Sequence, residues 1–507
     1  MTTSTHILGI DIGTTSTKTI LFAASGKVIV DRTVNYPLLS PQPEVQEQDP
    51  EEIYEAVTRS AREVIEQAGC KANLAGIAFS TAMHTLIAVD ADGAPLTRSI
   101  TWADRRSAPW VDKIRQQCDT HALYGRTGVP LHPMLPLVKL LWLKAEQPKV
   151  FEQAAKFISI KEYILHRWFG QFVVDHSIAN ATGLFNINSL DWDEEALSLA
   201  KISADRLSEL VPTTHVLKGM TEAAATALGL PAETPVVVGA SDGALANLGV
   251  GAIAPGEVTV TVGTSGAVRA SAEQPQTDPK ERLFCYALTE KRWVIGGATN
   301  NGGIVLRWVR DHLADAEVDT ANLLQTDPYN ILTDIAATVP AGSEGLIFHP
   351  YLAGERAPLW DANARGSFFG LALHHTKAHM IRAILEGIVY NLNVILAAVE
   401  DVAGETKGIH ATGGMVRSEL WRQMLADVFD QTILIPETFE SSCLGAAMLG
   451  LYALGHLDNL EDGMAMLGEA ESHPPNAEAA QHYRALLPLY DKLLAQVRPL
   501  YEGLAEL

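Results

Sequence analysis

Apolar residues follow strand-like runs and helical spacings in turn along the chain. Apolar runs at 6–12 and 17–22 flank the polar turn Gly13-Thr14-Thr15-Ser16, and a third run covers 27–34. This pattern predicts a three-stranded meander. Apolar positions spaced three and four residues apart then predict an amphipathic helix over 49–68. Strands that alternate with helices indicate a mixed α/β fold.

The same opening occurs again at mid-chain. The apolar strand 235–240 ends in Ser241-Asp242-Gly243, and alternating valines at 258–262 then lead into Gly263-Thr264-Ser265-Gly266 and another strand. About 250 residues separate the two Gly-Thr turns, which is half the chain. The sequence therefore predicts two halves built on one plan, a domain of residues 1–248 and a domain of residues 249–507.

The charge balance restricts the choice of partner. There are 38 Lys and Arg residues against 60 Asp and Glu residues, a net charge of −22, which argues against nucleic acid or a membrane as the partner. Four scattered cysteines predict no disulfide framework and no zinc site. The longest apolar stretch, 444–455, is too short to span a bilayer and predicts a buried helix. The N-terminus enters a strand pattern at once, so we expect a cytoplasmic protein.

The first Gly-Thr turn is the strongest candidate for chemistry. Its glycine lets backbone amides approach an anion, Thr14 and Thr15 add hydroxyl donors, and Lys18 adds a positive charge. Asp11, at the end of the preceding strand, suits Mg²⁺. The turn matches neither a Walker loop nor GxGxxG. The alternative is an ordinary hairpin with a solvated Lys18.

The second turn, with Thr264, repeats this chemistry. Two such hairpins that face each other across a cleft could hold the phosphates of one nucleotide from both sides. Gly-Gly at 413–414, before a helix that starts near Ser418, and the run Asn300-Asn301-Gly302-Gly303 both allow a flat ring to lie against backbone. For each of these two glycine pairs the alternative is a plain turn between a strand and a helix.

Asp242 follows the apolar strand at its carboxyl end, where α/β sheets carry functional groups. Small neighbours leave room for a substrate hydroxyl, so Asp242 is a candidate general base. The alternative is an N-cap for the next helix. Residues suited to binding a polyol follow other strand ends in the first half, although each also fits an ordinary loop or a solvated helix face. They are Met83, His84, Trp102, Asp104, Arg105 and Arg106.

Together these motifs resemble the FGGY family of carbohydrate kinases, in the actin/Hsp70-like ATPase superfamily. The resemblance extends along essentially the whole chain, through residues 9–18, 102–105, 239–243, 261–265 and 411–414. The two family signatures fit at 134–143 and 366–386, although Ala145 stands where a polar residue is usual. The resemblance implies an α/β fold of two actin/Hsp70-like (ribonuclease H-like) ATPase domains, with the active site in the cleft between them.

Within the family, the stretches 80–84, 128–134, 285–290 and 348–358 are most similar to the members that phosphorylate gluconate. The resemblance implies that ATP and Mg²⁺ serve to phosphorylate D-gluconate at its 6-hydroxyl, with Asp242 as base and Asp11 at the metal. It also implies that Thr14, Thr15, Lys18 and Thr264 hold the phosphates. Gly303, Arg307, Gly413, Gly414 and Ser418 would line the adenosine side. Arg105, Arg106 and His84 are the candidates for neutralising the carboxylate of gluconate.

Other functions remain open at this point. Xylulose kinases share the pattern, including the His84 position, and another sugar kinase of the family is a further alternative. An ATP-driven chaperone would need a peptide-binding region, but only about 90 residues follow Ser418. A non-catalytic sugar-binding regulator often begins with a helix-turn-helix, whereas here the nucleotide strand starts by residue 7. A homodimer is a further expectation.

Overall fold

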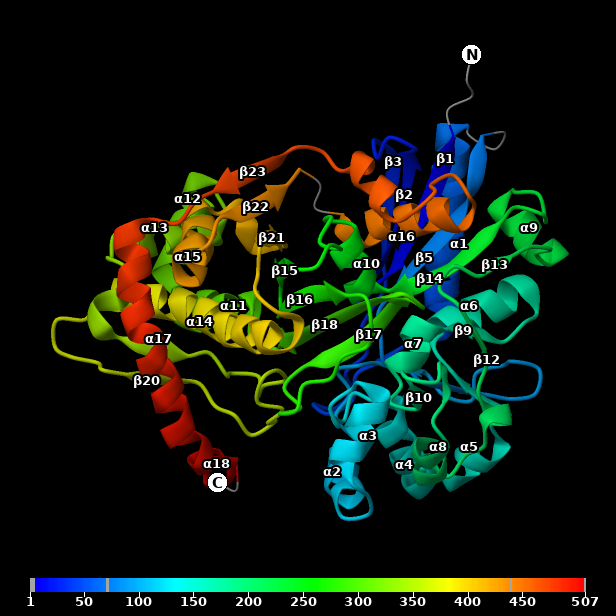
Figure 1. The fold of residues 1–507 in the computed structure, drawn as a ribbon, viewed down its shortest axis with the longest axis horizontal. Coiled ribbons are helices and arrows are strands. Elements are labelled where there is room, and N and C mark those ends of the chain that lie inside the picture. Colours follow the sequence, from blue (N-terminus) through cyan, green and yellow to red (C-terminus); the bar gives the residue numbers. More distant parts are fainter. Residues whose placement is uncertain (1–4, 70–72, 438–439, 506–507) are drawn as a thin grey trace.

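Two twisted β-sheets, one from each half of the chain, organise the protein (Figure 1). The structure is a computed structural model and describes residues 5–69, 73–437 and 440–505. Cys70 lies outside the described residues, and Cys118, Cys285 and Cys443 are free thiols.

The first sheet contains the predicted meander. Strands β1 (His6–Ile12), β2 (Ser16–Ala23) and β3 (Val28–Asn35) pair antiparallel in that order. On the other side of β1, strands β5 (Leu74–Thr81) and β14 (Val236–Ser241) run parallel to it, and β13 (Val216–Leu217) closes the edge. Side chains of β1, β5 and β14 are almost all buried, as expected for parallel strands covered on both faces.

The second sheet repeats this arrangement. Strands β15 (Glu257–Val262), β16 (Gly266–Ala272) and β18 (Arg292–Thr299) form an antiparallel meander, and β17 (Phe284–Thr289) extends it. Strands β21 (Gly408–Thr412) and β22 (Ile433–Pro436) run parallel to β15, and β23 (Ala470–His473) is the antiparallel edge. The paired turns thus belong to two sheets of the same plan, as the sequence predicts.

Helices cover both faces of the first sheet. On one face α1 (Pro50–Ala68) buries Ile53, Val57 and Val64 against the strands, within the range predicted for a helix. Asp49 is its N-cap, and Gly69 follows it in the left-handed conformation. On the other face lie α10 (Asp242–Leu248) and α16 (Ser441–Ala453). The predicted buried helix is therefore α16.

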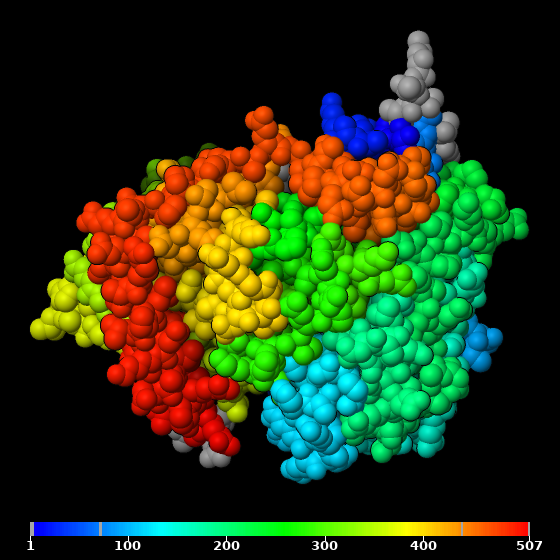
Figure 2. All heavy atoms as spheres, in the orientation of Figure 1, coloured from blue at the N-terminus to red at the C-terminus, as the bar shows by residue number. Residues whose placement is uncertain are grey.

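Helix α16 comes late in the sequence yet packs on the first sheet. In Figure 1 it is the orange helix beside the blue strands, and Figure 2 shows orange chain over them at the surface. It crosses α10 at glycines: a Cβ on Gly249 would lie 1.9 Å from the Ser441 carbonyl oxygen, and one on Gly445 would lie 2.0 Å from that of Leu245. The domain boundary at 248/249 stays a prediction. Helix α16 follows that boundary in sequence but packs on the sheet formed by the residues before it.

The second sheet packs against α14 (Lys377–Ala403), α11 (Gly303–His312), α15 (Glu419–Phe429) and α17 (Ala477–Val497). By length and composition α14 could cross a membrane, but most of its apolar window is buried against neighbouring elements, as in a core helix. Helix α17 makes up most of the described chain after Asn476.

The remaining helices are α2 (Ala108–Arg115), α3 (Thr120–Thr127), α4 (Pro136–Glu146), α5 (Pro148–Gln153), α6 (Ile160–Phe169), α7 (His176–Asn180), α8 (Glu194–Ala200), α9 (Glu222–Leu228), α12 (Asp315–Leu324), α13 (Pro328–Ala337) and α18 (Tyr501–Ala505). Short strands are β4 (Glu47–Gln48), β6 (Ile87–Val89), β7 (Ser99–Ile100), β8 (Lys156–Ile158), β9 (Val173–Asp175), β10 (Phe185–Asn186), β11 (Asp191–Trp192), β12 (Glu209–Val211), β19 (Ile347–His349) and β20 (Ser367–Phe369).

Candidate active site

Three parallel strands of the first sheet end at the same level. Thr81 of β5 pairs with Ile12 of β1 on one side and with Ser241 of β14 on the other. The residues that follow these strands, Gly13, Ala82 and Asp242, are therefore neighbours at the carboxyl edge of the sheet, where α/β folds place their sites.

A cavity of about 250 Å³ lies at this edge, between the two halves. The first half contributes five residues predicted from the sequence: Thr14, Met83, His84, Trp102 and Asp242. The second half contributes Thr261, Ser265, Arg269, Tyr286, Arg356 and Trp360, among others. The structure thus brings the base candidate, part of the polyol group and the second turn together around one enclosed space.

Asp242 is the first residue of α10, and the N-cap position belongs to Ser241. The N-cap alternative for Asp242 is therefore wrong. Its Oδ1 accepts a hydrogen bond from the Gly243 N–H at 2.7 Å. Burial raises the pKa of the Asp242 carboxyl above its usual range, against the opposing effect of the Arg269 guanidinium. A carboxylate with raised pKa, free of any ion pair to a described residue, is suited to accept a proton.

Asp11 lies beside Asp242. Its Oδ1 accepts a hydrogen bond from the Ser80 hydroxyl at 2.6 Å. Burial, reinforced by the nearby Asp242 carboxylate, raises the pKa of Asp11 to about 6, and Glu440 acts in the same direction. Two neighbouring carboxyl groups that raise each other's cost of ionisation suit a divalent cation.

The donor set also fits Mg²⁺ in particular. Within residues 5–69, 73–437 and 440–505 no three acidic, His or Cys side chains form a ready metal cluster. Mg²⁺ usually needs none, because it is held by one or two carboxylates together with substrate phosphates.

In the structure Lys18 is paired with a carboxylate, so its ammonium is not available to a phosphate. Its ammonium lies 2.6 Å from the Glu440 carboxylate, and both side chains are about one-third exposed. Lys18 must exchange this partner to hold a phosphate, so its role stays a prediction.

The two Gly-Thr turns have the same local geometry. In the first, the Gly13 N–H donates to the Ser16 carbonyl at 2.9 Å, and in the second, the Gly263 N–H donates to the Ser265 carbonyl at 2.9 Å. In the first turn the Trp102 indole N–H donates to the Thr14 hydroxyl at 3.0 Å. Thr15 and Thr264 are exposed at the tips of the turns, free to meet a ligand.

Glycines predicted for the adenosine side adjoin the second turn. The Gly303 N–H, at the start of α11, donates to the Gly263 carbonyl at 2.7 Å. Gly413 has φ 97°, and a Cβ there would lie 2.4 Å from the Val262 carbonyl oxygen, so only glycine fits. A Cβ on Gly414 would meet open space.

Arg307 and Ser418 lie further along the helices that start here. Arg307 is exposed on α11, and Ser418 is the N-cap of α15. The adenosine contacts stay a prediction.

His84 has a fixed and neutral imidazole. Its Nδ1–H donates to the Ala181 carbonyl at 2.6 Å, which leaves Nε2 to accept from the Tyr286 hydroxyl at 3.3 Å. Burial, with Lys139 nearby, lowers the pKa of His84 to about 3. This environment favours the neutral imidazole, so the structure gives no support to His84 as the group that neutralises a carboxylate, and that role stays a prediction.

The acidic and basic residues after Trp102 do not line the cavity. Arg106 forms ion pairs with Asp104 at 2.8 Å and Glu47 at 2.5 Å, and lies over the ring of Trp142. The Asp104 carboxylate also accepts from the Gln46 N–H at 3.0 Å. Arg105 is exposed. Arg106 is thus neutralised within the protein, and Asp104 braces the loop that presents Trp102.

Sequence reasoning missed two arginines of the cavity, Arg269 and Arg356. Arg269 was detectable as a charged residue within the apolar strand that follows the second turn. It also missed a fully buried ion pair behind the base, between Lys161 and Asp175 at 2.6 Å. The Lys161 ammonium approaches the Ala240 carbonyl, two residues before Asp242.

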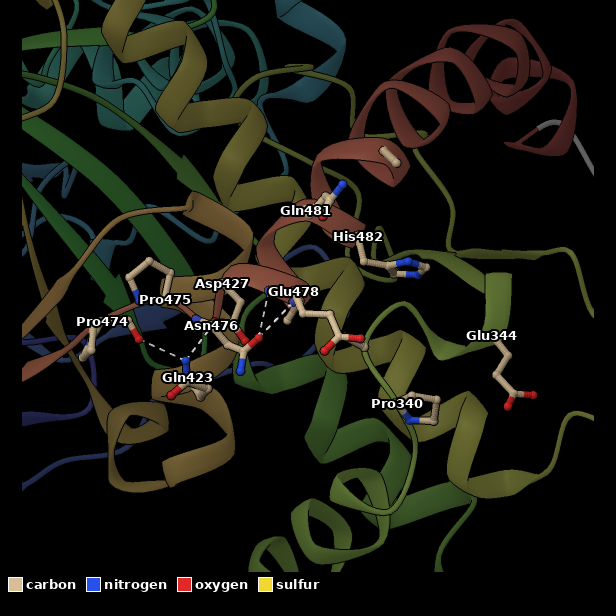
Figure 3. Close-up of a pocket in the computed structure, with 13 residues that line it drawn as sticks. Pro340, Glu344, Gln423, Asp427, Pro474, Pro475, Asn476, Glu478, Gln481 and His482 are labelled. Atoms are coloured by element: carbon tan, nitrogen blue, oxygen red, sulfur yellow. Dashed lines mark hydrogen bonds between the residues drawn. The ribbon is translucent and has the colours of Figure 1, made fainter.

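A second hollow lies elsewhere, against α17 on the second half (Figure 3). It is a wide cleft of about 1140 Å³. Gln423 donates to Asp427 at 2.8 Å, and Asp427 also accepts from the Asn476 N–H at 2.6 Å. None of the candidate residues predicted from the sequence lines this cleft.

A Gly-Thr turn from each half and the Asp242 carboxylate thus border one cavity between the halves, and sequence comparison gives the family of the chain. The chain belongs to the FGGY family of carbohydrate kinases: residues 6–249 match its N-terminal domain and residues 258–454 its C-terminal domain. The fold is accordingly the predicted pair of actin/Hsp70-like ATPase domains.

Within this family, the chain is similar to kinases of two kinds, gluconate kinases and xylulose kinases. The chain is 50% identical to "Gluconokinase" from Bacillus subtilis (strain 168), over 99% of this chain and 98% of that one. A solved gluconate kinase from Lactobacillus acidophilus superposes with TM-score 0.93 at 38% identity, covering 99% of this chain and 100% of that chain. A solved ligand-bound xylulose kinase from the same organism gives TM-score 0.93 at 37% identity, with the same coverage.

Proposed function

We propose that this kinase transfers the γ-phosphoryl group of ATP to the 6-hydroxyl of D-gluconate, giving 6-phospho-D-gluconate and ADP. The observation that carries the proposal is the cavity itself, in which Asp242 and two arginines lie together beside the second Gly-Thr turn. The 50% identity to a gluconokinase supports the choice of acceptor.

Asp242 takes the proton of the attacking hydroxyl. The buried carboxylate has a raised pKa, which brings its basicity closer to the working pH. Thr14, Thr15 and Thr264 hold phosphate oxygens through their hydroxyls and the backbone amides of the turns, together with Lys18 once it leaves Glu440. Phosphoryl transfer depends mainly on such positioning and on charge stabilisation.

Asp11 would hold Mg²⁺, the ion that neutralises charge on the β- and γ-phosphates when bound. Met83, Trp102 and Tyr286 form the walls of the acceptor pocket, and the neutral His84 Nε2 accepts a hydrogen bond there. Closure of the two halves over the cavity would exclude water and limit ATP hydrolysis. Gly303, Gly413, Gly414, Ser418 and Arg307 form the adenosine side.

D-Xylulose is the second candidate acceptor, because a solved xylulose kinase is as similar in fold as the solved gluconate kinase. The two positive charges in the cavity favour an anionic acceptor over a neutral ketose. A cytoplasmic location and a homodimer stay predictions from the sequence.

The test is ADP release by the purified protein with Mg-ATP and each acceptor in turn: D-gluconate, D-xylulose, L-ribulose, glycerol or none. We expect selective turnover with gluconate, and product carrying its phosphate on C6 by ³¹P–¹H correlation. Selective turnover with xylulose would identify xylulose, and not gluconate, as the acceptor. Equal ADP release without any acceptor would overturn the kinase assignment.

A further inference from the structure

Two guanidinium groups enter the acceptor cavity from the second half. Arg269 projects from β16, and Arg356 lies in the loop that follows β19. Neither forms an ion pair with an acidic side chain of the described residues, although the chain as a whole carries a net charge of −22. Two buried cations that form no ion pair with a described residue of an acidic protein need a reason.

Arg269 is held beside the base. Its Nη1 donates to the Thr261 hydroxyl at 3.4 Å, a long hydrogen bond. A Cβ on Gly243 would lie 3.2 Å from the Arg269 Nε, so the guanidinium packs on the backbone next to Asp242. Its buried Nε–H has no hydrogen-bond partner.

Arg356 is held over an aromatic ring. Its Cζ lies 5.1 Å from the centroid of the Trp102 ring, which belongs to the first half. Its Nη2 donates to the Thr299 carbonyl at 3.3 Å, and its buried Nε–H also has no partner. The adjacent carboxylate, that of Glu355, is already occupied by hydrogen bonds from Thr299, Asn300 and Asn391.

The two cations are only partly compensated by the protein. Burial lowers the pKa of both arginines, although the Asp242 carboxylate acts in the opposite direction on Arg269 and the Glu355 carboxylate does so on Arg356, and the charge of Arg356 lowers the pKa of Arg269 further. A buried N–H without a partner is unfavourable, and more so when the group is charged. An anion that accepts from both guanidiniums would relieve the repulsion and the missing hydrogen bonds together.

We infer that Arg269 and Arg356 together bind the carboxylate of the sugar acid and select it over neutral sugars. Guanidinium groups match carboxylates in geometry and charge, and both arginines line the cavity that contains Asp242. The inference rests on the proposed function. It replaces Arg105 and Arg106 in the role expected from the sequence.

A transferred phosphoryl group is the other anion that two arginines could bind. The two roles differ in kinetics. A carboxylate is present in the ground state, so loss of its partner raises KM for the acid. A phosphoryl partner acts in the transition state, so its loss lowers kcat for every acceptor.

The experiment measures kcat and KM for Arg269→Gln and Arg356→Gln with D-gluconate and with D-glucitol, which has an alcohol in place of the carboxylate. We expect KM for gluconate to rise on the order of 10- to 100-fold in each variant, since hydrogen bonds to charged groups contribute about 1.5–3 kcal/mol. KM for ATP and the kinetics with glucitol should stay near those of the wild type. Arg269→Lys and Arg356→Lys keep the charge and should recover part of the loss.

Arg115→Gln is the matched control, because Arg115 is exposed on α2 and paired only with Asp112 among the described acidic residues. Stabilisation by Mg-ADP against thermal unfolding verifies that each variant is folded. A fall in kcat with both acceptors and unchanged KM would assign the arginines to the phosphoryl group and overturn the inference. Unchanged KM for gluconate in both variants would overturn the inference about the two arginines and leave the proposed function standing. Absence of gluconate turnover in the wild type would overturn the proposed function as well.

Discussion

The crossing of α10 and α16 gives a quantitative prediction. Replacement of Gly445 by Ala adds a methyl group whose carbon would lie 2.0 Å from the Leu245 carbonyl oxygen, a backbone atom that cannot turn away. An ordinary contact needs about 3.4 Å, so the helices must separate by about 1 Å. Asp242 begins the same helix three residues before Leu245, and therefore moves with it.

We expect two effects of Gly445→Ala. Overpacking should lower the free energy of unfolding by about 1–3 kcal/mol, measured by urea titration. Displacement of the base by about 1 Å should lower kcat with gluconate on the order of 10²-fold, measured by ADP release. The second effect tests whether α10 transmits the position of α16 to the site.

Gly125→Ala is the control, since Gly125 lies within α3 and a Cβ there would meet no atom within 4 Å. It should raise stability by about 0.5–1 kcal/mol, because alanine is the better helix former, and leave kcat unchanged. If Gly445→Ala matched Gly125→Ala in both measurements, the proposed coupling between the helix crossing and the base would be refuted.

Two further predictions concern buried charge. Lys161→Met leaves the Asp175 carboxylate buried without its cation and should lower the free energy of unfolding by about 3–5 kcal/mol, measured by urea titration. Adding Asp175→Asn removes the unpaired charge and should recover part of the loss. A loss under about 1 kcal/mol in Lys161→Met would contradict the prediction. His84 has a pKa of about 3 when folded against 6.5 when unfolded, so below pH 6.5 the unfolded state takes up a proton that the folded state refuses. The contribution of His84 to the free energy of unfolding should therefore fall by about 1.4 kcal/mol per pH unit between pH 6.5 and about 3. His84→Asn should abolish this dependence, and asparagine tolerates the positive φ of the position. Parallel curves of stability against pH for the wild type and the variant would contradict the prediction.

Local pattern was sufficient for the elements that build the first sheet. The strands over 6–12 and 17–22 and the helix over 49–68 are where the apolar periods place them, because each is determined by neighbours in sequence. Convergence of Asp11, His84 and Asp242 was also predictable, since each follows or ends a strand of one parallel sheet.

What could not be predicted depends on residues distant in sequence. The apolar run at 444–455 indicated a buried helix but not which sheet would cover it, and α16 packs on the sheet of the other half. Arg106 was expected to face substrate because one of its two neutralising partners, Glu47, lies 59 residues away, although the other, Asp104, is two residues away. Arg356 reaches the cavity only because its loop folds over Trp102, from 254 residues away in the chain.

The central claim is that Asp242 is the base of a gluconate-phosphorylating site, and replacement by Asn tests it most directly because the amide keeps the shape and loses the basicity. ADP formation with gluconate should fall by about 10²–10⁴-fold in Asp242→Asn, while affinity for Mg-ATP, measured by calorimetry, stays that of the wild type. Turnover equal to that of the wild type would contradict the assignment of Asp242, whatever the acceptor.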